Sequence, residues 1–400
     1  MKKFLMVLFL AGLLPATIAA AEGAAVSAGT GQAILGISPD TKTITIKAVT
    51  ADGSEVQVEG CTVTELPSGE SVRLTATGNR IVLKGAITEL RCSGNQLTSL
   101  DVQGLQALTV LECAGNDLTS LDVHGLTALA VLDCSENQLT SLNVQGLTAL
   151  QKLNCSKNLL TSLNTQDFNA LKGFDCSDNL LTSLNVQDLT ALEELNCSGN
   201  KLSSLNVQGL SALKVLYCSD NGLTLLNVQG LTALEKLACS GNKLTSLNVQ
   251  GLTALRYLSC RYNQLKTLDL KGLTGLRELW CSGNELAALD MRGINTLQIL
   301  GCSNNKLTAL ELPAVNVLQE LYCYGNRLNE KAFIRIFNNL PERDGNEAGR
   351  AFIYGEKNNP QEKNITNFSS SAKLRTAFEA AKAKNWEFYK RDTNGNDEKI

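Results

Sequence analysis

The sequence predicts an α/β repeat solenoid, with a curved parallel β-sheet on its concave face and short, non-helical segments on its convex face. Two observations lead to this prediction. Twelve of the 13 cysteines in the 400-residue chain recur at every twenty-first position, and an asparagine three positions after each of them keeps the same interval. Such a constant interval indicates stacked repeats, in which each unit buries its apolar face against its neighbours.

Residues 1–21 have the features of a signal peptide. Two lysines precede an apolar run over residues 4–14, and small residues before Glu22 allow cleavage after Ala21. The run is too short to cross the roughly 30 Å core of a bilayer, which disfavours the alternative of an uncleaved membrane anchor. No later segment has the length and apolar character to cross a membrane. We therefore expect an exported chain, extracellular or on the cell surface, with the periplasm as the alternative.

Residues 22–86 are expected to form an N-terminal β cap. Alternating apolar residues mark short strands, for example around residues 43–46 and 81–83, and glycines separate these runs. A stack of repeats exposes apolar surface at its first unit unless another element covers it. A small antiparallel unit is the expected cover. Cys61 lies outside the register of the repeats, and we expect it to be a buried cap residue rather than a reactive thiol.

Twelve repeats of equal length occupy residues 87–338. In the unit over residues 150–170 (LQKLNCSKNLLTSLNTQDFNA), Leu153 and Cys155 alternate with polar residues, which predicts a short strand with one buried face. Asn158 follows, where its amide can bond to backbone groups as the chain turns, and stacking should align these asparagines in a ladder. The return segment of about ten residues is too short for a full helix and its turns, so extended or single-turn structure is expected there.

The motif L-x-x-L-x-C-x-x-N-x-L over residues 87–338 is that of leucine-rich repeats, with Cys at an inward strand position that is usually Leu. The chain resembles secreted bacterial proteins of the internalin family, and in particular the internalin-J-like subgroup, whose 21-residue repeats carry a cysteine ladder. This resemblance implies a curved parallel-sheet solenoid and a role in adhesion or protein binding. The chain departs from the family near Ile400, where no Leu-Pro-x-Thr-Gly sorting signal is present, so covalent attachment to a cell wall is not expected.

Three roles are open to the repeated cysteines: disulfides, metal sites and a stack of buried thiols. Neighbouring rungs of a sheet lie about 4.8 Å apart with parallel Cα–Cβ bonds, whereas a disulfide needs Cβ atoms near about 3.8 Å and a metal needs convergent thiolates. This geometry favours a ladder of reduced, buried thiols that pack as small apolar side chains. The ladder residues are Cys92, Cys113, Cys134, Cys155, Cys176, Cys197, Cys218, Cys239, Cys260, Cys281, Cys302 and Cys323.

Residues 339–390 are expected to form a C-terminal α/β cap, followed by a polar tail over residues 391–400. The period of the repeats breaks after Asn326, and the patterns that follow are helical and strand-like in turn. Such a unit resembles the C-terminal caps of related bacterial leucine-rich repeat proteins. The predicted elements are helices over residues 330–340 and 372–384 and strands over residues 350–354 and 386–389.

The composition argues against several classes of function. A net charge of −3 with 19 % charged residues excludes a basic nucleic-acid-binding protein and a highly charged disordered chain. The single histidine, His124, lies in a return segment where other repeats carry Gln, and no catalytic or nucleotide-binding motif is found. We therefore expect no enzymatic activity, no cofactor and no metal site.

The outward strand positions vary most from repeat to repeat, and every Tyr and Trp of the repeats lies in or beside the strands of units seven to twelve. Aromatic and arginine side chains gathered on a polar face are typical of interaction hot spots, whereas the alternative is cross-strand packing alone. An acidic half on units two to five is expected to steer a basic partner. The candidate ligand-binding residues are Tyr217, Tyr257, Arg261, Tyr262, Trp280, Tyr322 and Tyr324, and the acidic half consists of Glu112, Asp133 and Asp175.

These observations predict a secreted or surface-exposed, monomeric binding protein. Its concave sheet is expected to hold another protein, from a host or a bacterial surface, in adhesion. The alternative is a structural scaffold of the envelope that has no single high-affinity ligand.

Overall fold

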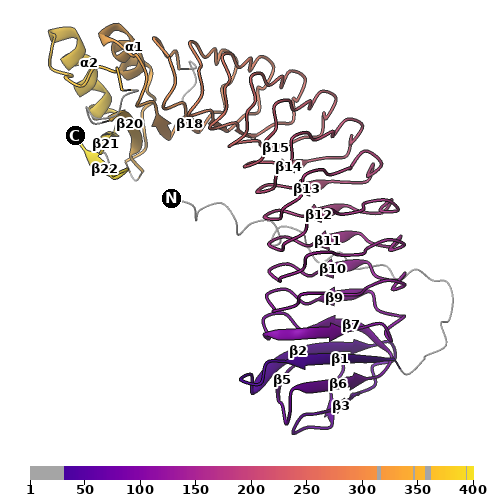
Figure 1. Cartoon of the computed structure of the whole chain (residues 1–400). Coiled ribbons are helices and arrows are strands. Elements are labelled where there is room, and N and C mark those ends of the chain that lie inside the picture. The colour runs from indigo at the N-terminus through magenta and orange to yellow at the C-terminus, as the bar shows by residue number, and fades with distance from the viewer. Residues whose placement is uncertain (1–30, 313–316, 346, 356–361, 393) are drawn as a thin grey trace.

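The computed structural model describes residues 31–312, 317–345, 347–355, 362–392 and 394–400, and the predicted signal peptide lies outside these residues. The chain forms an arc of stacked coils with a further unit at each end (Figure 1). One continuous sheet follows the arc. It begins with β5 (Ser71–Thr75) and β2 (Thr43–Thr50), passes through the repeats, and ends with β20 (Gly349–Gly355), β21 (Trp386–Arg391) and β22 (Asp397–Lys399).

The repeats contribute one short parallel strand each, beginning with β7 (Ile87–Arg91). Successive strands pair in register exactly one repeat apart, as in Leu132 opposite Leu153, so equivalent side chains stack along the sheet. The predicted parallel solenoid is therefore confirmed. The strands after β7 are β9 (Val110–Glu112), β10 (Val131–Asp133), β11 (Lys152–Asn154), β12 (Gly173–Asp175), β13 (Glu194–Asn196), β14 (Val215–Tyr217), β15 (Lys236–Ala238), β16 (Tyr257–Ser259), β17 (Glu278–Trp280), β18 (Ile299–Gly301) and β19 (Glu320–Tyr322).

The return segments run along the convex side as tight turns. In one repeat, Leu126 N donates to Val123 O at 3.2 Å and Leu129 N donates to Leu126 O at 2.9 Å. Gly125 between them has a φ of 80°, a left-handed conformation that glycine adopts without a steric penalty. Where these return segments are described, they contain turns and no helix, as their length predicts.

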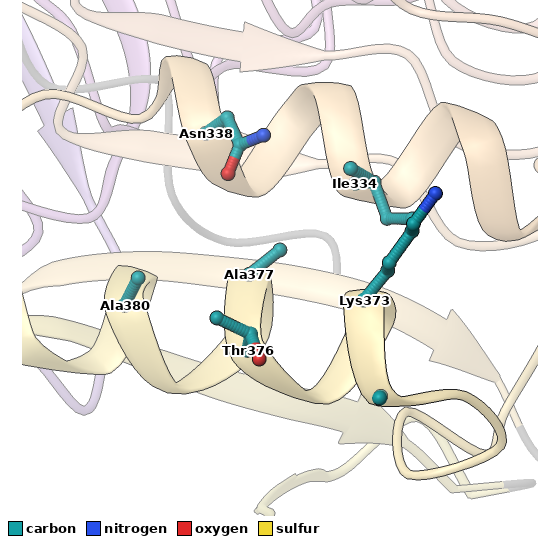
Figure 2. A pocket seen from close by; sticks show the side chains of 7 residues that line it. Ile334, Asn338, Lys373, Thr376, Ala377 and Ala380 are labelled. Carbon is teal, nitrogen blue, oxygen red and sulfur yellow. The ribbon is translucent and has the colours of Figure 1, made fainter.

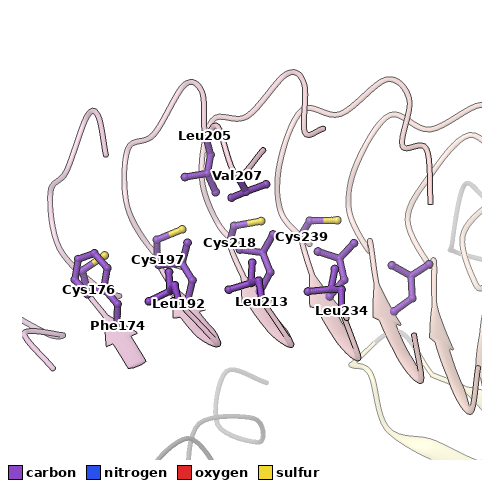
Figure 3. Packing of buried hydrophobic residues seen from close by; sticks show 14 of the residues in the cluster. Phe174, Cys176, Leu192, Cys197, Leu205, Val207, Leu213, Cys218, Leu234 and Cys239 are labelled. Atoms are coloured by element: carbon purple, nitrogen blue, oxygen red, sulfur yellow. The ribbon is translucent and has the colours of Figure 1, made fainter. Parts of the chain in front are cut away.

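The core is a single stack of leucines and cysteines inside the coils. Figure 3 shows Cys176, Cys197, Cys218 and Cys239 on successive rungs with their sulfur atoms pointing the same way. All twelve ladder cysteines are fully buried, and the 13 cysteines carry free thiols. Burial raises the pKa of these thiols, to about 12 at Cys197, which keeps them in the neutral form that an apolar interior favours. The predicted cysteine ladder is confirmed.

The repeated asparagines form a second ladder that joins each coil to the preceding one. Asn158 Nδ2 donates to Cys155 O at 3.1 Å within its own repeat and to Cys134 O at 3.0 Å in the preceding repeat. Its Oδ1 accepts from Leu139 N at 2.9 Å. Each buried amide thus satisfies backbone groups that the strand ends leave unpaired, and it fixes the spacing between coils.

The N-terminal unit covers the first coil with antiparallel strands. In the long sheet, β2 pairs with β7. In a second, five-stranded sheet, β8 (Leu97–Asp101) of the first repeat pairs with β1 (Gln32–Ile37). The first repeat therefore extends into both sheets of the cap. The strands of the second sheet, in spatial order, are β4 (Glu65–Leu66), β3 (Val56–Glu59), β6 (Arg80–Lys84), β1 (Gln32–Ile37) and β8.

The C-terminal unit has two helices, α1 (Glu330–Asn339) and α2 (Ala372–Ala383), which begin at side-chain caps. α1 begins inside the range predicted for the last repeat, and it packs through Phe333 and Phe337 against a cluster of buried phenylalanines. Among the described residues, no helix is long and apolar enough to span a membrane.

Asn364 of the C-terminal unit continues the asparagine ladder beyond the last repeat. Its Nδ2 donates to Cys323 O at 3.0 Å and Ile353 O at 2.8 Å, and its Oδ1 accepts from Leu328 N at 2.8 Å. Glu362, two positions earlier, accepts from three backbone amides, including that of Gly325 at 2.8 Å. The cap therefore supplies the bonds that a further repeat would have made.

Candidate functional site

Three positions of each repeat lie on the concave side of the sheet. They are the first and third residues of the strand and the residue that follows the cysteine, whereas the central leucine and the cysteine point inward. Tyr257, Leu258 and Ser259 of β16 illustrate the alternation, since Leu258 is fully buried and Tyr257 is only partly covered. Because the rungs are in register, each of these positions forms a column along the arc.

An aromatic row occupies the third-position column at the C-terminal end of the sheet. We define it as Trp280, Tyr322, Phe352 and Tyr389. The ring centroids of Trp280 and Tyr322 lie 5.4 Å apart, those of Tyr322 and Phe352 4.4 Å apart, and those of Phe352 and Tyr389 4.9 Å apart. The last two pairs are stacked, which adds attraction beyond the area they bury. The row therefore crosses from the repeats into the C-terminal cap without a break.

Gly301 makes the first contact of this row possible. It occupies the third position of β18, between Trp280 and Tyr322, and its lack of a side chain lets the indole lie across it. A Cβ on Gly301 would come within 2.2 Å of Trp280 Cε3. The glycine thus allows two rings that are two rungs apart to touch.

A glutamate on the same strand holds the polar end of each polar ring in the aromatic row. The acceptor lies two positions before the ring and therefore on the same face of the sheet. This bond limits the rotation of the ring and leaves the row pre-ordered. The three pairs are Trp280 Nε1 with Glu278 at 3.3 Å, the Tyr322 hydroxyl with Glu320 at 2.7 Å and the Tyr389 hydroxyl with Glu387 at 2.6 Å.

Arg261 lies at the N-terminal end of the aromatic row. Its guanidinium carbon is 3.8 Å from the centroid of the Trp280 ring, a cation–π contact. Burial lowers the pKa of Arg261, although the group remains charged at neutral pH. Among the described residues, its side chain forms no ion pair and no hydrogen bond, and its Nε is buried without a partner.

Tyr217 and Tyr257 lie on β14 and β16, on the N-terminal side of Arg261, and both are partly covered. Burial raises the pKa of Tyr217 to about 12 and raises that of Tyr257 as well. Both phenols therefore stay neutral at physiological pH.

Tyr262 and Tyr324 follow the strands rather than lying on them. Tyr262 is 64 % exposed and has a φ of 52°, the left-handed region that costs a non-glycine residue roughly 1–2 kcal/mol. Its ring lies against Gly283 of the next repeat, where a Cβ would come within 2.6 Å of Tyr262 Cδ1. The Tyr324 hydroxyl accepts from Arg391 Nη1 at 3.0 Å, which ties this tyrosine to the C-terminal cap.

The acidic half, Glu112, Asp133 and Asp175, has bonding partners within the sheet. Glu112 forms an ion pair with Arg91. Asp133 accepts from the hydroxyl of Ser135 at 2.6 Å. Asp175 makes the same 2.6 Å contact with the serine two positions after it, and burial raises the pKa of both aspartates.

Asn154, in the same column, makes the equivalent bond to Ser156 at 2.7 Å, so a neutral amide serves equally well there. These contacts give Asp133 and Asp175 a structural role at the strand end. That the acidic half also steers a partner remains a prediction.

Two further features lie away from the concave face. His124 is exposed in a return segment, and its backbone amide donates to Asp122 at 3.0 Å. A hollow of about 420 Å³ lies between α1 and α2, and Figure 2 shows aliphatic side chains lining it beside Asn338, Lys373 and Thr376. Within the described ranges, no three His, Cys, Asp or Glu residues are grouped so that they could hold a metal ion.

Two members of the aromatic row, Phe352 and Tyr389, were not expected from the sequence. Both belong to the C-terminal cap, where the register of the repeats no longer identifies equivalent positions. The signal that could have found them is the strand pattern itself, since each follows a buried residue, Ala351 or Phe388, that faces the core.

Comparisons with known proteins agree with this architecture. Residues 253–291 match the family model described as leucine rich repeats (2 copies). The solved functional domain of InlJ from Listeria monocytogenes, which includes a cysteine ladder, is 32 % identical, with a TM-score of 0.65 over 75 % of this chain and 63 % of that domain. The chain thus spans less than two thirds of the InlJ structure. None of the curated proteins compared matches the chain.

Two other solved structures are similar at lower identity. A leucine-rich repeat protein of Leptospira interrogans is 26 % identical, with a TM-score of 0.56 over 74 % of this chain and 82 % of that one. YopM from Yersinia enterocolitica is also 26 % identical, with a TM-score of 0.52 over 63 % of this chain and 57 % of that one. No enzyme family is indicated by any of these matches.

Proposed function

The chain is a leucine-rich repeat protein of the internalin-J-like, cysteine-ladder type, and from this premise we propose that it binds another protein through the C-terminal half of its concave sheet. The leucine-rich repeat solenoid is a fold that commonly mediates protein–protein interaction. We further propose that the chain is exported and that the interaction serves adhesion at a cell surface.

The observation that carries this proposal is the aromatic row with Arg261 at its end. Aromatic and arginine side chains supply most of the energy in protein interfaces, especially when they are rigid before binding. The stacked rings of Tyr322 and Phe352 and the bond from Tyr322 to Glu320 support such rigidity. Tyr262 adds an exposed aromatic ring in the next position after Arg261, at a turn whose left-handed φ is shared by equivalent residues such as Lys157.

The curvature of the sheet supports the same location. A concave face lets a partner contact several rungs at once, and the aromatic row extends over β17 to β21. The acidic half has its charges bonded within the sheet, which leaves the C-terminal half as the part of the face with large, partly exposed apolar groups.

Site-specific crosslinking tests the proposal. A photoreactive phenylalanine analogue replaces Tyr262, which is 64 % exposed, and in a matched control it replaces Leu225, which is 65 % exposed but lies in a return segment. Both variants are irradiated with host-cell and bacterial envelope extracts. A discrete product from position 262 alone supports the proposal. Equal products from both positions, or products from position 225 alone, would contradict it.

A further inference from the structure

We propose that Arg261 is a docking point for a carboxylate, so that the partner presents an Asp or Glu side chain to the N-terminal end of the aromatic row. This inference rests on the proposed function and defines the chemistry of the partner more narrowly. It differs from the expectation of a basic partner that the acidic half suggested.

The first support is the distribution of charge around the aromatic row. Two other arginines on the strands at this end of the sheet have acidic partners in the chain itself: Arg350 pairs with Glu320, and Arg391 pairs with Asp397 at 2.8 Å. Arg261 has no such partner among the described residues, although it is partly buried. A buried charge without a counter-ion is costly, and an incoming carboxylate would remove that cost.

The second support is the orientation of the guanidinium group. Stacking on Trp280 at 3.8 Å uses the face of the planar group, and the N–H bonds lie in its plane. None of these N–H groups makes a hydrogen bond with a described residue. A carboxylate can therefore accept two parallel bonds at the edge of the guanidinium, which is the strong, geometrically specific form of this interaction.

The third support comes from the hydroxyl groups beside Arg261. Ser240 Oγ accepts from the Arg261 backbone amide at 3.1 Å and lies 2.8 Å from Ser259 Oγ. The groups around the Arg261 guanidinium are thus neutral hydroxyls, and Arg261 supplies the one positive charge. This combination suits a carboxylate with a single negative charge better than a phosphate, which carries nearly two.

A peptide-display selection against the purified protein supplies the probe. Random peptides are selected on the native protein, and those that lose binding to Trp280→Ala are kept, because they depend on the aromatic row. We expect each retained consensus to contain an Asp or Glu. The affinity of one such peptide is then measured for four combinations: the native protein or Arg261→Gln, with the acidic residue intact or changed to its amide.

Each single change should weaken the affinity about tenfold. The double change should weaken it no further, because either single change already removes the same contact between Arg261 and the carboxylate. Arg277→Gln, an exposed arginine at the edge of β17, is the matched control and should leave affinity unchanged. Independent effects that multiply to about a hundredfold would overturn the carboxylate assignment, as would tighter binding when a phosphoserine replaces the acidic residue.

The outcomes separate the two proposals. Row-dependent peptides without an acidic residue, or with equal affinity for Arg261→Gln, would overturn the role of Arg261 and leave the proposed binding face intact. If no selected peptide depends on Trp280, both proposals fail.

Discussion

Trp280 lies across Gly301, the residue at the equivalent position on the next strand, and reaches Tyr322 on the strand after that. A Cβ on Gly301 would come within 2.2 Å of Trp280 Cε3, while the Trp280 and Tyr322 ring centroids lie 5.4 Å apart. The aromatic row therefore depends on one glycine in the column, and this dependence can be tested directly.

Gly301→Ala should displace the indole of Trp280 while the coil stays folded. The rigid strand backbone carries the new methyl group, so the ring must move, and its contacts with Tyr322 and Arg261 should be lost. We expect a shift in tryptophan emission and a roughly tenfold loss of partner affinity. Gly173→Ala is the matched control, because its Cβ would meet nothing closer than Lys152 Cγ at 3.8 Å. An unchanged emission spectrum for Gly301→Ala would show that the indole does not lie where we describe it.

The ladder thiols should be unreactive in the native protein. Burial raises the pKa of Cys92, Cys197 and Cys260 to about 12, so almost no thiolate forms at pH 8. Cys61 differs from the sequence expectation of a buried residue: it is only partly buried, so a reagent can reach its sulfur, although burial raises its pKa as well. A thiol-specific reagent at pH 8 should therefore detect about one fast thiol natively and all 13 after denaturation without reductant.

The variant Cys61→Ser should remove the fast phase of the thiol reaction and leave the slow reaction of the ladder thiols unchanged. A near-zero count in the denatured, unreduced protein would mean that the ladder is disulfide-bonded. Several fast thiols in the native protein would mean that the coils are not closed around their sulfur atoms.

Removing one asparagine of the ladder should destabilise the solenoid strongly. Asn242 Nδ2 donates to Cys218 O at 3.0 Å and Cys239 O at 3.1 Å, and its Oδ1 accepts from Leu223 N at 3.0 Å. Asn242→Ala leaves these buried groups unpaired and should lower the free energy of unfolding by about 3 kcal/mol. Asn248→Ala, in an exposed return segment with one local bond, should cost less than about 1 kcal/mol. Denaturant titration measures both, and equal costs would argue against the ladder as the main tie between coils.

Asp175 should make stability depend on pH in a defined direction. Burial raises its folded-state pKa, so the protonated form is relatively favoured in the folded chain. The associated stabilisation is complete below the unfolded pKa and is lost as the pH rises through the folded pKa. We therefore expect the melting temperature of the native protein, relative to that of Asp175→Asn, to increase as the pH is lowered from 7.5 to 4.5. The exposed Asp188→Asn is the control, and a relative melting temperature that falls on acidification would show that the pKa shift has the opposite sign.

The repeats could be predicted from the sequence because their physics is local and periodic. Cys155 and Asn158 recur at a fixed interval, and the interval alone places them on one strand and its turn. The bonds from Asn158 to Cys134 O and Leu139 N follow once neighbouring coils are stacked in register. Asp133 and Asn154 both precede a Cys-Ser pair in the sequence, but their structural role depends on serine hydroxyls that donate back to these side chains.

The remainder of the site could not be predicted, because it depends on contacts between residues that share no sequence period. Asn364 completes the asparagine ladder although it lies 41 residues after Cys323, to which it bonds. Phe352 and Tyr389 join the aromatic row only because β20 and β21 continue the sheet in parallel. The sequence identifies Trp280 and Arg261 as neighbours on adjacent rungs, but the stacking of one on the other depends on side-chain orientation.

Partner binding at the aromatic end of the concave sheet should depend on the rings of Tyr257, Trp280 and Tyr322. The most direct measurement compares the affinity of the native protein and of the Tyr257→Ala/Trp280→Ala/Tyr322→Ala triple variant for the partner crosslinked at position 262. Circular dichroism and melting temperature confirm that the variant is folded. We predict a loss of affinity of about a hundredfold or more in a variant that retains its fold. A folded triple variant that binds the partner as tightly as the native protein would show that the partner does not bind at this end of the sheet.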